Sequence, residues 1–143
     1  MLDLSRTSIA IPEEFRELRY NGGHFPGAGA TSGVEGGANC QQYAYSLLRH
    51  HGYELPDFRS SELWADTDHT AVVQRMEPFD LVLFHDTPES WGAHVGLCVG
   101  DDMVLHLSKR IGTPVIETLT EMRQREEYRC LIGIKRVLRR TGN

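Results

Sequence analysis

The sequence predicts an α+β fold in which N-terminal helices pack on a central antiparallel β-sheet. Helix-capping residues and helical apolar spacing occur in the first half, whereas segments rich in Val, Ile and Leu between turn residues occur in the second half. Helices that precede strands, instead of alternating with them, favour an antiparallel sheet. The length of 143 residues predicts a single domain, residues 1–143, because it is too short for two cores.

The composition excludes several classes of protein. Hydrophobic residues make up 40% and charged residues 24% of the chain, which excludes a disordered, collagen-like or coiled-coil protein. A net charge of −5 argues against a nucleic-acid partner, which requires a basic surface. The longest apolar runs, such as Leu81–Phe84, are far shorter than the roughly 20 residues of a membrane span. We therefore expect no nucleic-acid partner and no membrane span.

The N-terminus and the cysteines bear on the cellular compartment. The segment Met1–Arg6 contains Asp3 and lacks the basic start and apolar run of a Sec signal peptide, which predicts a cytoplasmic protein or export by a non-Sec route. An odd and sparse set of cysteines is not a disulfide framework, so we expect free thiols. The cysteines are Cys40, Cys98 and Cys130.

Two features are expected before the first long helix. Pro12–Glu14 begin a short helix that directs Phe15 and Leu18 inward. The Gly22–Gly37 stretch holds 7 of the 14 glycines and is expected to be irregular, because each glycine adds backbone entropy that nothing local offsets. This stretch is either a lid or specificity loop, or a plain surface insertion.

The long helix is expected to begin at Cys40. Asn39 is a favoured N-cap, and Gly52 is a natural stop after the last turn. At 100° per residue, one face of this helix carries Cys40, Ala44, Leu47 and His51.

The remaining elements are mostly strands. Ser60 or Ser61 is expected to cap a shorter helix. Thr118 and Glu121 form a capping box that begins a helix between the last strands. The expected strands are 80–85, 94–99, 103–108 and 130–137.

Cys40 is the candidate nucleophile. The first turn of a helix offers a partial positive charge and free N–H groups, which favour a thiolate, and a thiolate attacks carbonyl carbons. The alternative is a small core cysteine that packs beside Ala44 and Leu47.

Two histidines could serve this thiol. His94 and His106 lie six residues on either side of Gly100. A hairpin loop centred on Gly100 would place them face to face with Cβ atoms about 4.5–5.5 Å apart, whereas a two-residue turn at Asp101–Asp102 would place them on opposite faces. Facing histidines suit a triad in which His94 accepts the proton of Cys40 and His106 orients His94. The alternative is two unrelated histidines.

Other patterns are weaker. The glycine-rich stretch lacks the Gly-x-x-x-x-Gly-Lys pattern of a phosphate loop. The chain also lacks the C-x-x-C and H-E-x-x-H patterns of zinc sites, so we expect no metal and no organic cofactor. Cys98 shares the strand face of His94 and either lines the same cleft or packs in the core, while His85 at a strand end is a further candidate.

These motifs resemble the NlpC/P60 family. His94–Gly100 followed by Met103–His106 resembles the family's His-Val-Gly-Ile-Tyr-Val-Gly segment and its third polar residue, at the same spacing. Pro78–Phe84 is similar to its Pro-Gly-Asp-Leu-Val-Phe-Phe strand, with phenylalanine in place of the glycine. Gly52–Pro56 matches the Gly-Ile-x-Leu-Pro that follows the nucleophile helix, and Ile134–Val137 resembles the closing strand.

The resemblance implies a papain-like cysteine peptidase that cuts peptidoglycan stem peptides, at the γ-D-glutamyl–diamino acid bond, without a cofactor. By position, Cys40 is similar to the family nucleophile, His94 to the base and His106 to the third residue. The family usually has Asp-Cys-Ser where this chain has Asn39 and Gln41 around the cysteine, so these two positions are expected to bear on substrate binding.

Tyr20 is the remaining residue that the resemblance implies for substrate binding. It begins an imperfect copy of the family's Tyr-x-x-Gly-Gly, followed by a longer glycine-rich spacer. The missing cell-wall-binding repeats suggest an exported effector, a phage-type lysin or a cytoplasmic recycling enzyme. An effector would need an immunity or inhibitor protein as its partner.

Two other functions stay open at this point. One is acyl transfer on a lipid or protein amide by the same scaffold, which an apolar channel beside Cys40 would support. The other is an inactive binding module, in which the His94 side chain would lie more than about 4 Å from the Cys40 sulfur.

Overall fold

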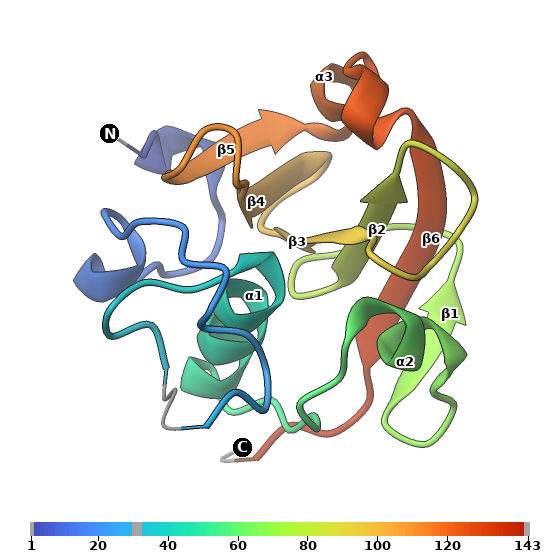
Figure 1. The fold of residues 1–143 in the computed structure, drawn as a ribbon, viewed down its shortest axis with the longest axis horizontal. Helices are drawn as coiled ribbons and strands as arrows, with labels where there is room; N and C mark the ends of the chain where they lie inside the picture. Colours follow the sequence, from blue (N-terminus) through green and yellow to red (C-terminus); the bar gives the residue numbers. More distant parts are fainter. Residues whose placement is uncertain (1, 30–32, 142–143) are drawn as a thin grey trace.

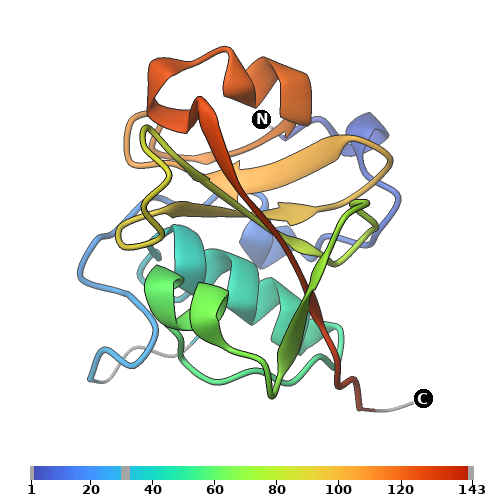
Figure 2. The ribbon, with the colours of Figure 1, turned by 90° about the vertical axis from the view of Figure 1, so that its right-hand side faces the viewer.

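The computed structural model describes residues 2–29 and 33–141. A six-stranded sheet lies between two groups of helices (Figures 1 and 2). Helices α1 (Cys40–His50) and α2 (Ser60–Ala65) cover one face, and α3 (Leu119–Arg123) covers the other, as Figure 2 shows. Met1 and residues 30–32 of the glycine-rich stretch lie outside the described residues. No helix within residues 2–29 or 33–141 has the length and apolar character needed to cross a membrane.

The sheet has the strand order β1-β6-β2-β3-β4-β5, and every neighbouring pair is antiparallel. The predicted α+β class with an antiparallel sheet is therefore confirmed. Four strands match the predicted segments, whereas the two edge strands, β1 and β5, were not predicted. An edge strand is short and is held by pairing on one side only, so its local sequence pattern is weak. The strands are β1 (Thr70–Val73), β2 (Leu81–His85), β3 (His94–Cys98), β4 (Met103–Leu107), β5 (Pro114–Thr118) and β6 (Cys130–Val137).

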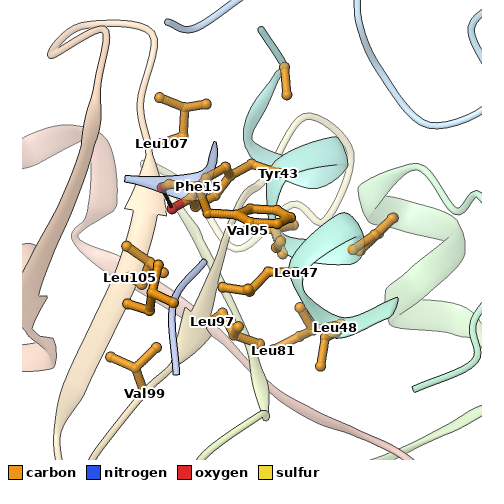
Figure 3. Close-up of a cluster of buried hydrophobic side chains, with 14 of the residues drawn as sticks. Phe15, Tyr43, Leu47, Leu48, Leu81, Val95, Leu97, Val99, Leu105 and Leu107 are labelled. Carbon is orange, nitrogen blue, oxygen red and sulfur yellow. Dashed lines mark hydrogen bonds between the residues drawn. The ribbon is translucent and has the colours of Figure 1, made fainter. Parts of the chain in front are cut away.

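The main core lies between the sheet and α1 (Figure 3). Alternate strand residues point to opposite faces, so a strand covered on both sides reads as a continuous apolar run. The Tyr43 hydroxyl donates a 2.6 Å hydrogen bond to the Phe15 carbonyl, which satisfies the one polar atom of that ring. A smaller cluster on the other face comprises Val82, Phe84, Val104, Met122, Tyr128 and Ile134.

Local capping signals place two helices as predicted. Asn39 Oδ1 accepts from the Gln42 backbone N–H at 2.8 Å and so begins α1. Gly52 ends it with a φ of 92°, and a Cβ there would lie 2.6 Å from the Thr141 carbonyl oxygen. At α3, the reciprocal hydrogen bonds of Thr118 and Glu121 form the predicted capping box.

Two predictions about helices need correction. The segment after Pro12 forms only a 3₁₀ turn, Glu13–Phe15, although Phe15 is buried as expected. The N-cap of α2 is Arg59 rather than a serine, because the Ser60 hydroxyl instead donates to the Ser90 carbonyl at 2.8 Å. This tertiary contact removes Ser60 from the capping role that its residue type favours.

Candidate active site

Cys40 is the first residue of α1, the helix that packs against β3 and β4. The backbone N–H groups of Val95, Gln41 and Cys40 itself face its sulfur and favour the thiolate. Burial is the larger influence, and it raises the pKa of the Cys40 thiol above its ordinary value. The expected thiolate at the helix start is therefore not the resting form. The contact with Val95 nevertheless places the sulfur beside the residue that follows His94.

The two histidines lie on one face of the β3–β4 hairpin but are not directly opposite each other. The register centres the hairpin loop on Asp101, which is neither the loop centred on Gly100 nor the two-residue turn at Asp101–Asp102 that the sequence allowed. It places His106 opposite Gly96 and His94 on the diagonal. Diagonal neighbours are still within reach of ring side chains.

The imidazole rings meet over the glycine between them. His94 Nε2 and His106 Nδ1 are 2.9 Å apart, and the rings are perpendicular with centroids separated by 4.9 Å. A Cβ at Gly96 would lie 2.5 Å from Val104 Cγ1 and 3.5 Å from the Cβ of His106. Gly96 thus provides the space in which the diagonal pair forms its hydrogen bond.

A buried carboxylate extends this pair. Glu117 Oε1 accepts from His106 Nε2 at 2.8 Å, and Arg125 holds Glu117 through two hydrogen bonds of 2.6 and 2.5 Å. The hydrogen bond from His106, aided by Arg125, lowers the pKa of Glu117 to about 2, so this carboxylate is charged at neutral pH.

The ionised carboxylate decides which ring nitrogens carry protons. His106 donates its Nε2–H to Glu117, so neutral His106 has an unprotonated Nδ1 that accepts the Nε2–H of His94. Nδ1 of His94 then has a free lone pair and can accept a proton. This is the tautomer that a general base requires.

The sequence analysis missed three residues around the pair. Glu117 lies on β5 opposite Val104, on the face that carries His106. A glutamate within the short apolar run of β5 was a partial signal, but it could be used only once that strand was known. Nothing in the sequence pointed to Arg125 or Tyr128.

Tyr128 packs against both histidines on the face of the sheet that is turned away from α1. Its ring stacks on His94 with centroids 4.6 Å apart and an interplanar angle of 25°, and it meets His106 edge-on. Burial raises the pKa of Tyr128 to about 12, although a hydrogen bond with Ser108 opposes this shift. Burial, with a smaller contribution from His106, holds the pKa of His94 well below 6.5, so His94 is neutral at pH 7.

The predicted substrate-binding residues lie around the nucleophile. Tyr20 pairs its backbone with Ala38, two residues before Cys40. Burial raises the pKa of Tyr20, and a negative charge on Cys40 adds to the effect, which shows that the phenol lies within electrostatic reach of the thiol. Asn39 is the N-cap, and Gln41 is buried with no hydrogen-bond partner for Oε1 among the described residues.

The other candidates lie apart from this arrangement. The Cys98 thiol is fully buried and donates to the Gly100 carbonyl at 2.9 Å, so it packs instead of lining a cleft. His85 at the end of β2 contacts Asp86 and Thr87. The three cysteines are unpaired, as predicted. Within the described ranges, no three acidic, histidine or cysteine side chains are grouped so as to hold a metal ion.

The arrangement provides a half-buried thiol, a neutral imidazole with a free nitrogen and a charged carboxylate behind it. Such a set can move a proton from sulfur to imidazole and then stabilise the imidazolium that forms. Its chemistry is nucleophilic attack on a carbonyl carbon.

Comparisons with known proteins concern the family and the fold. The chain matches the model of the NlpC/P60 family over residues 21–131. No curated protein matches the sequence. Among solved structures, an NlpC/P60 family protein from Bacillus cereus ATCC 10987 is similar, with a TM-score of 0.59 and 18% identity over 85% of this chain. The chain spans 36% of the length of that protein, so the likeness concerns the fold alone.

Proposed function

Because this chain belongs to the NlpC/P60 family of cell-wall cysteine peptidases and amidases, we propose that it hydrolyses an amide bond in peptidoglycan stem peptides with Cys40 as the nucleophile. The scissile amide in this proposal is the γ-D-glutamyl–diamino acid bond. The observation that carries the proposal is the hydrogen-bonded series from His94 through His106 to Glu117, which leaves one nitrogen of His94 free, next along β3 to Val95, whose backbone N–H faces the Cys40 sulfur.

The reaction begins with neutral partners. Burial raises the pKa of Cys40 and lowers that of His94, so a thiolate–imidazolium pair is not the resting state. Proton transfer from Cys40 to Nδ1 of His94 accompanies attack of the sulfur on the amide carbonyl. His106 and the charged Glu117 stabilise the imidazolium as it forms.

The second half of the reaction uses the same groups in reverse. Imidazolium His94 gives its proton to the leaving amine, which departs from the tetrahedral intermediate and leaves an acyl-enzyme on Cys40. Neutral His94 then takes a proton from water, whose oxygen attacks the thioester carbonyl. The C–S bond breaks, the acid is released, and His94 returns its proton to the departing Cys40 sulfur. The backbone N–H of Cys40, free at the start of α1, is one donor for the oxyanion.

The polar surroundings favour a peptide over a lipid as the substrate. The ionisable side chains within electrostatic reach of Cys40 include Tyr20, Tyr45, Arg59 and Tyr128. An acyl chain would require apolar walls at the same place. The hydrogen-bonded histidine pair likewise argues against an inactive binding module, since packing alone does not require it.

Hydrolysis of purified stem peptides, followed by mass spectrometry, tests the proposal. We expect the wild type to release fragments cut at the γ-D-glutamyl bond and Cys40→Ser to release none. Cys130→Ser, which removes a partly exposed thiol at the start of β6, is the matched control and should keep full activity. Equal activity in Cys40→Ser, or no hydrolysis of any stem peptide by the folded wild type, would overturn the proposal.

A further inference from the structure

Arg59 is a partly buried cation that makes no ion pair with an acidic residue in the ranges 2–29 and 33–141. Its Nε atom is buried without a hydrogen bond, and its guanidinium lies over the Phe25 ring at 4.6 Å from the centroid. In the part of the chain that the structure describes, every other partly or fully buried Arg or Lys side chain makes an ion pair or a hydrogen bond. These are Arg6, Arg16, Arg49, Arg125, Lys135 and Arg136.

The two nearest acids along the chain are already engaged. Asp57 pairs with Arg49 at 2.8 Å. Glu62 accepts the backbone N–H of Arg59 at 2.8 Å and so stabilises the first turn of α2, not the guanidinium. The neighbouring Ser60 hydroxyl bonds to the Ser90 carbonyl, in the loop that leads into His94. Arg59 is therefore anchored next to the segment that positions the base.

The guanidinium acts on the nucleophile and its surroundings. Its positive charge lowers the pKa of Cys40, Tyr20 and Tyr45, in each case against a larger rise caused by burial. A charge acts on three groups in this way only when it lies close to all of them.

Two further polar atoms point to the same region. Gln41 Oε1 and Tyr45 Oη are buried without partners and lie one helical turn apart on α1. Together with Arg59 Nε, they are the three buried side-chain polar atoms without a partner in residues 2–29 and 33–141. Buried polar groups are normally hydrogen-bonded, so a cluster of exceptions beside a nucleophile indicates a place that binds a polar group.

We infer that Arg59 binds a carboxylate of the substrate, next to the amide that Cys40 attacks. The inference rests on the proposed function and adds a requirement for a negative charge on the acyl side. A guanidinium presents paired donors that match a carboxylate and is always charged. A γ-linked glutamyl residue supplies this group, because its α-carboxylate stays free when the γ-carboxyl forms the amide.

Alkylation of Cys40 tests the inference without a substrate. Iodoacetate carries a carboxylate and iodoacetamide does not, so the ratio of their rate constants at Cys40 reports the local charge, whatever the thiol pKa. We expect Arg59→Gln to lower this ratio about fivefold at low ionic strength, the factor for roughly one opposite charge at close range. Arg59→Lys should keep most of the ratio. Arg75→Gln changes an exposed arginine and should leave the ratio unchanged.

A substrate pair gives the second readout. We expect the wild type to cleave a stem peptide with a free α-carboxylate with a kcat/KM about tenfold higher than the same peptide with an α-carboxamide. Arg59→Gln should lose this preference yet still cleave the carboxamide.

The outcomes separate this inference from the proposed function. An unchanged alkylation ratio and preference in Arg59→Gln, with only a lower Tm, would make Arg59 a structural partner of Phe25 and overturn the inference, while hydrolysis by Cys40 would stand. Loss of all hydrolysis in the wild type would overturn the proposed function instead.

Discussion

Two arginine–carboxylate pairs lie on the two sides of β3 in the sheet, one at the start of β2 and one on β5, and they differ in the third group that the carboxylate binds. Near the end of β3, Arg136 holds Asp80 through two hydrogen bonds of 2.9 Å, and Asp80 also accepts the backbone N–H of Glu77. The third partner of this pair is therefore a backbone group. The pair holds the start of β2 against β6.

On β5, the carboxylate of Glu117, held by Arg125, binds an imidazole ring instead. It accepts from His106, which in turn accepts from His94. An arginine–carboxylate pair therefore stabilises the fold on one side of β3 and sets a tautomer on the other. The third partner decides whether the pair acts on structure or on chemistry.

The largest effect on kcat is expected at His94, the residue proposed to accept the proton of Cys40. His94→Ala removes the proton acceptor and should lower kcat by about 10²–10⁴-fold. The Glu117–Arg125 pair stays in place, so the variant should remain folded, which circular dichroism and a cooperative thermal transition would check. Retention of more than half of the activity would show that His94 is not the base.

The direct comparison of the two pairs comes next. Glu117→Gln should lower kcat about tenfold, because His106 loses the charge that fixes its tautomer, with KM nearly unchanged. Asp80→Asn should instead lower the free energy of unfolding by about 2–3 kcal/mol and keep kcat at permissive temperature. Urea unfolding and steady-state kinetics on both variants check this. If the two variants changed kcat and the free energy of unfolding by similar amounts, the two pairs would not differ in role.

A smaller effect is expected at the glycine between the histidines. Gly96→Ala places a Cβ 2.5 Å from Val104 Cγ1, which should destabilise the fold by about 1–3 kcal/mol and separate the two rings. Gly100→Ala on the same hairpin meets no atom closer than 3.6 Å and serves as the control. The contrary result is a Gly96→Ala protein as stable and active as the Gly100→Ala one.

The smallest effect is a dependence of stability on pH. Burial holds the pKa of His94 well below 6.5 in the folded protein, whereas the unfolded chain has a pKa of about 6.5 at this residue. Below that pH the unfolded state binds the extra proton, so the stability from neutral His94 is complete above about pH 6.5 and is lost as the pH falls.

Urea titrations at two pH values measure this contribution. Between pH 7.5 and 5.5 the wild type should lose about 1 kcal/mol more than His94→Gln does. His50→Gln, at an exposed position on α1, should behave as the wild type. Glu117, with a pKa of about 2, adds a separate loss only at lower pH, as the pH falls below its ordinary pKa of 4.5. An equal loss in wild type and His94→Gln would contradict the neutral state of His94.

The candidate nucleophile, base and third residue could be named from the sequence because their signals are local. Cys40 follows a capping Asn39, and a loop of odd length between the two strands is enough to place His94 and His106 on one face, whereas the two-residue turn that the sequence also allowed would not have done so. The exact register could not be predicted, because a loop one residue longer or shorter costs little locally and the packing of the whole hairpin decides.

The sequence by itself determined what depends on neighbouring residues: the α1 and α3 caps, the four inner strands, the helices-then-strands order and the identity of the thiol and imidazoles. Only the tertiary structure decided the edge strands and the contacts of Glu117 with His106 and with Arg125, because the sheet register and the packing around it bring these residues together.

The pKa values show the same division most clearly. A helix start favours a thiolate at Cys40, and that much is written in the local sequence. Burial of Cys40 and His94 outweighs it, since desolvation depends on every element that packs around the two groups. The residue types could therefore be predicted from the sequence, but their protonation states depend on the folded structure.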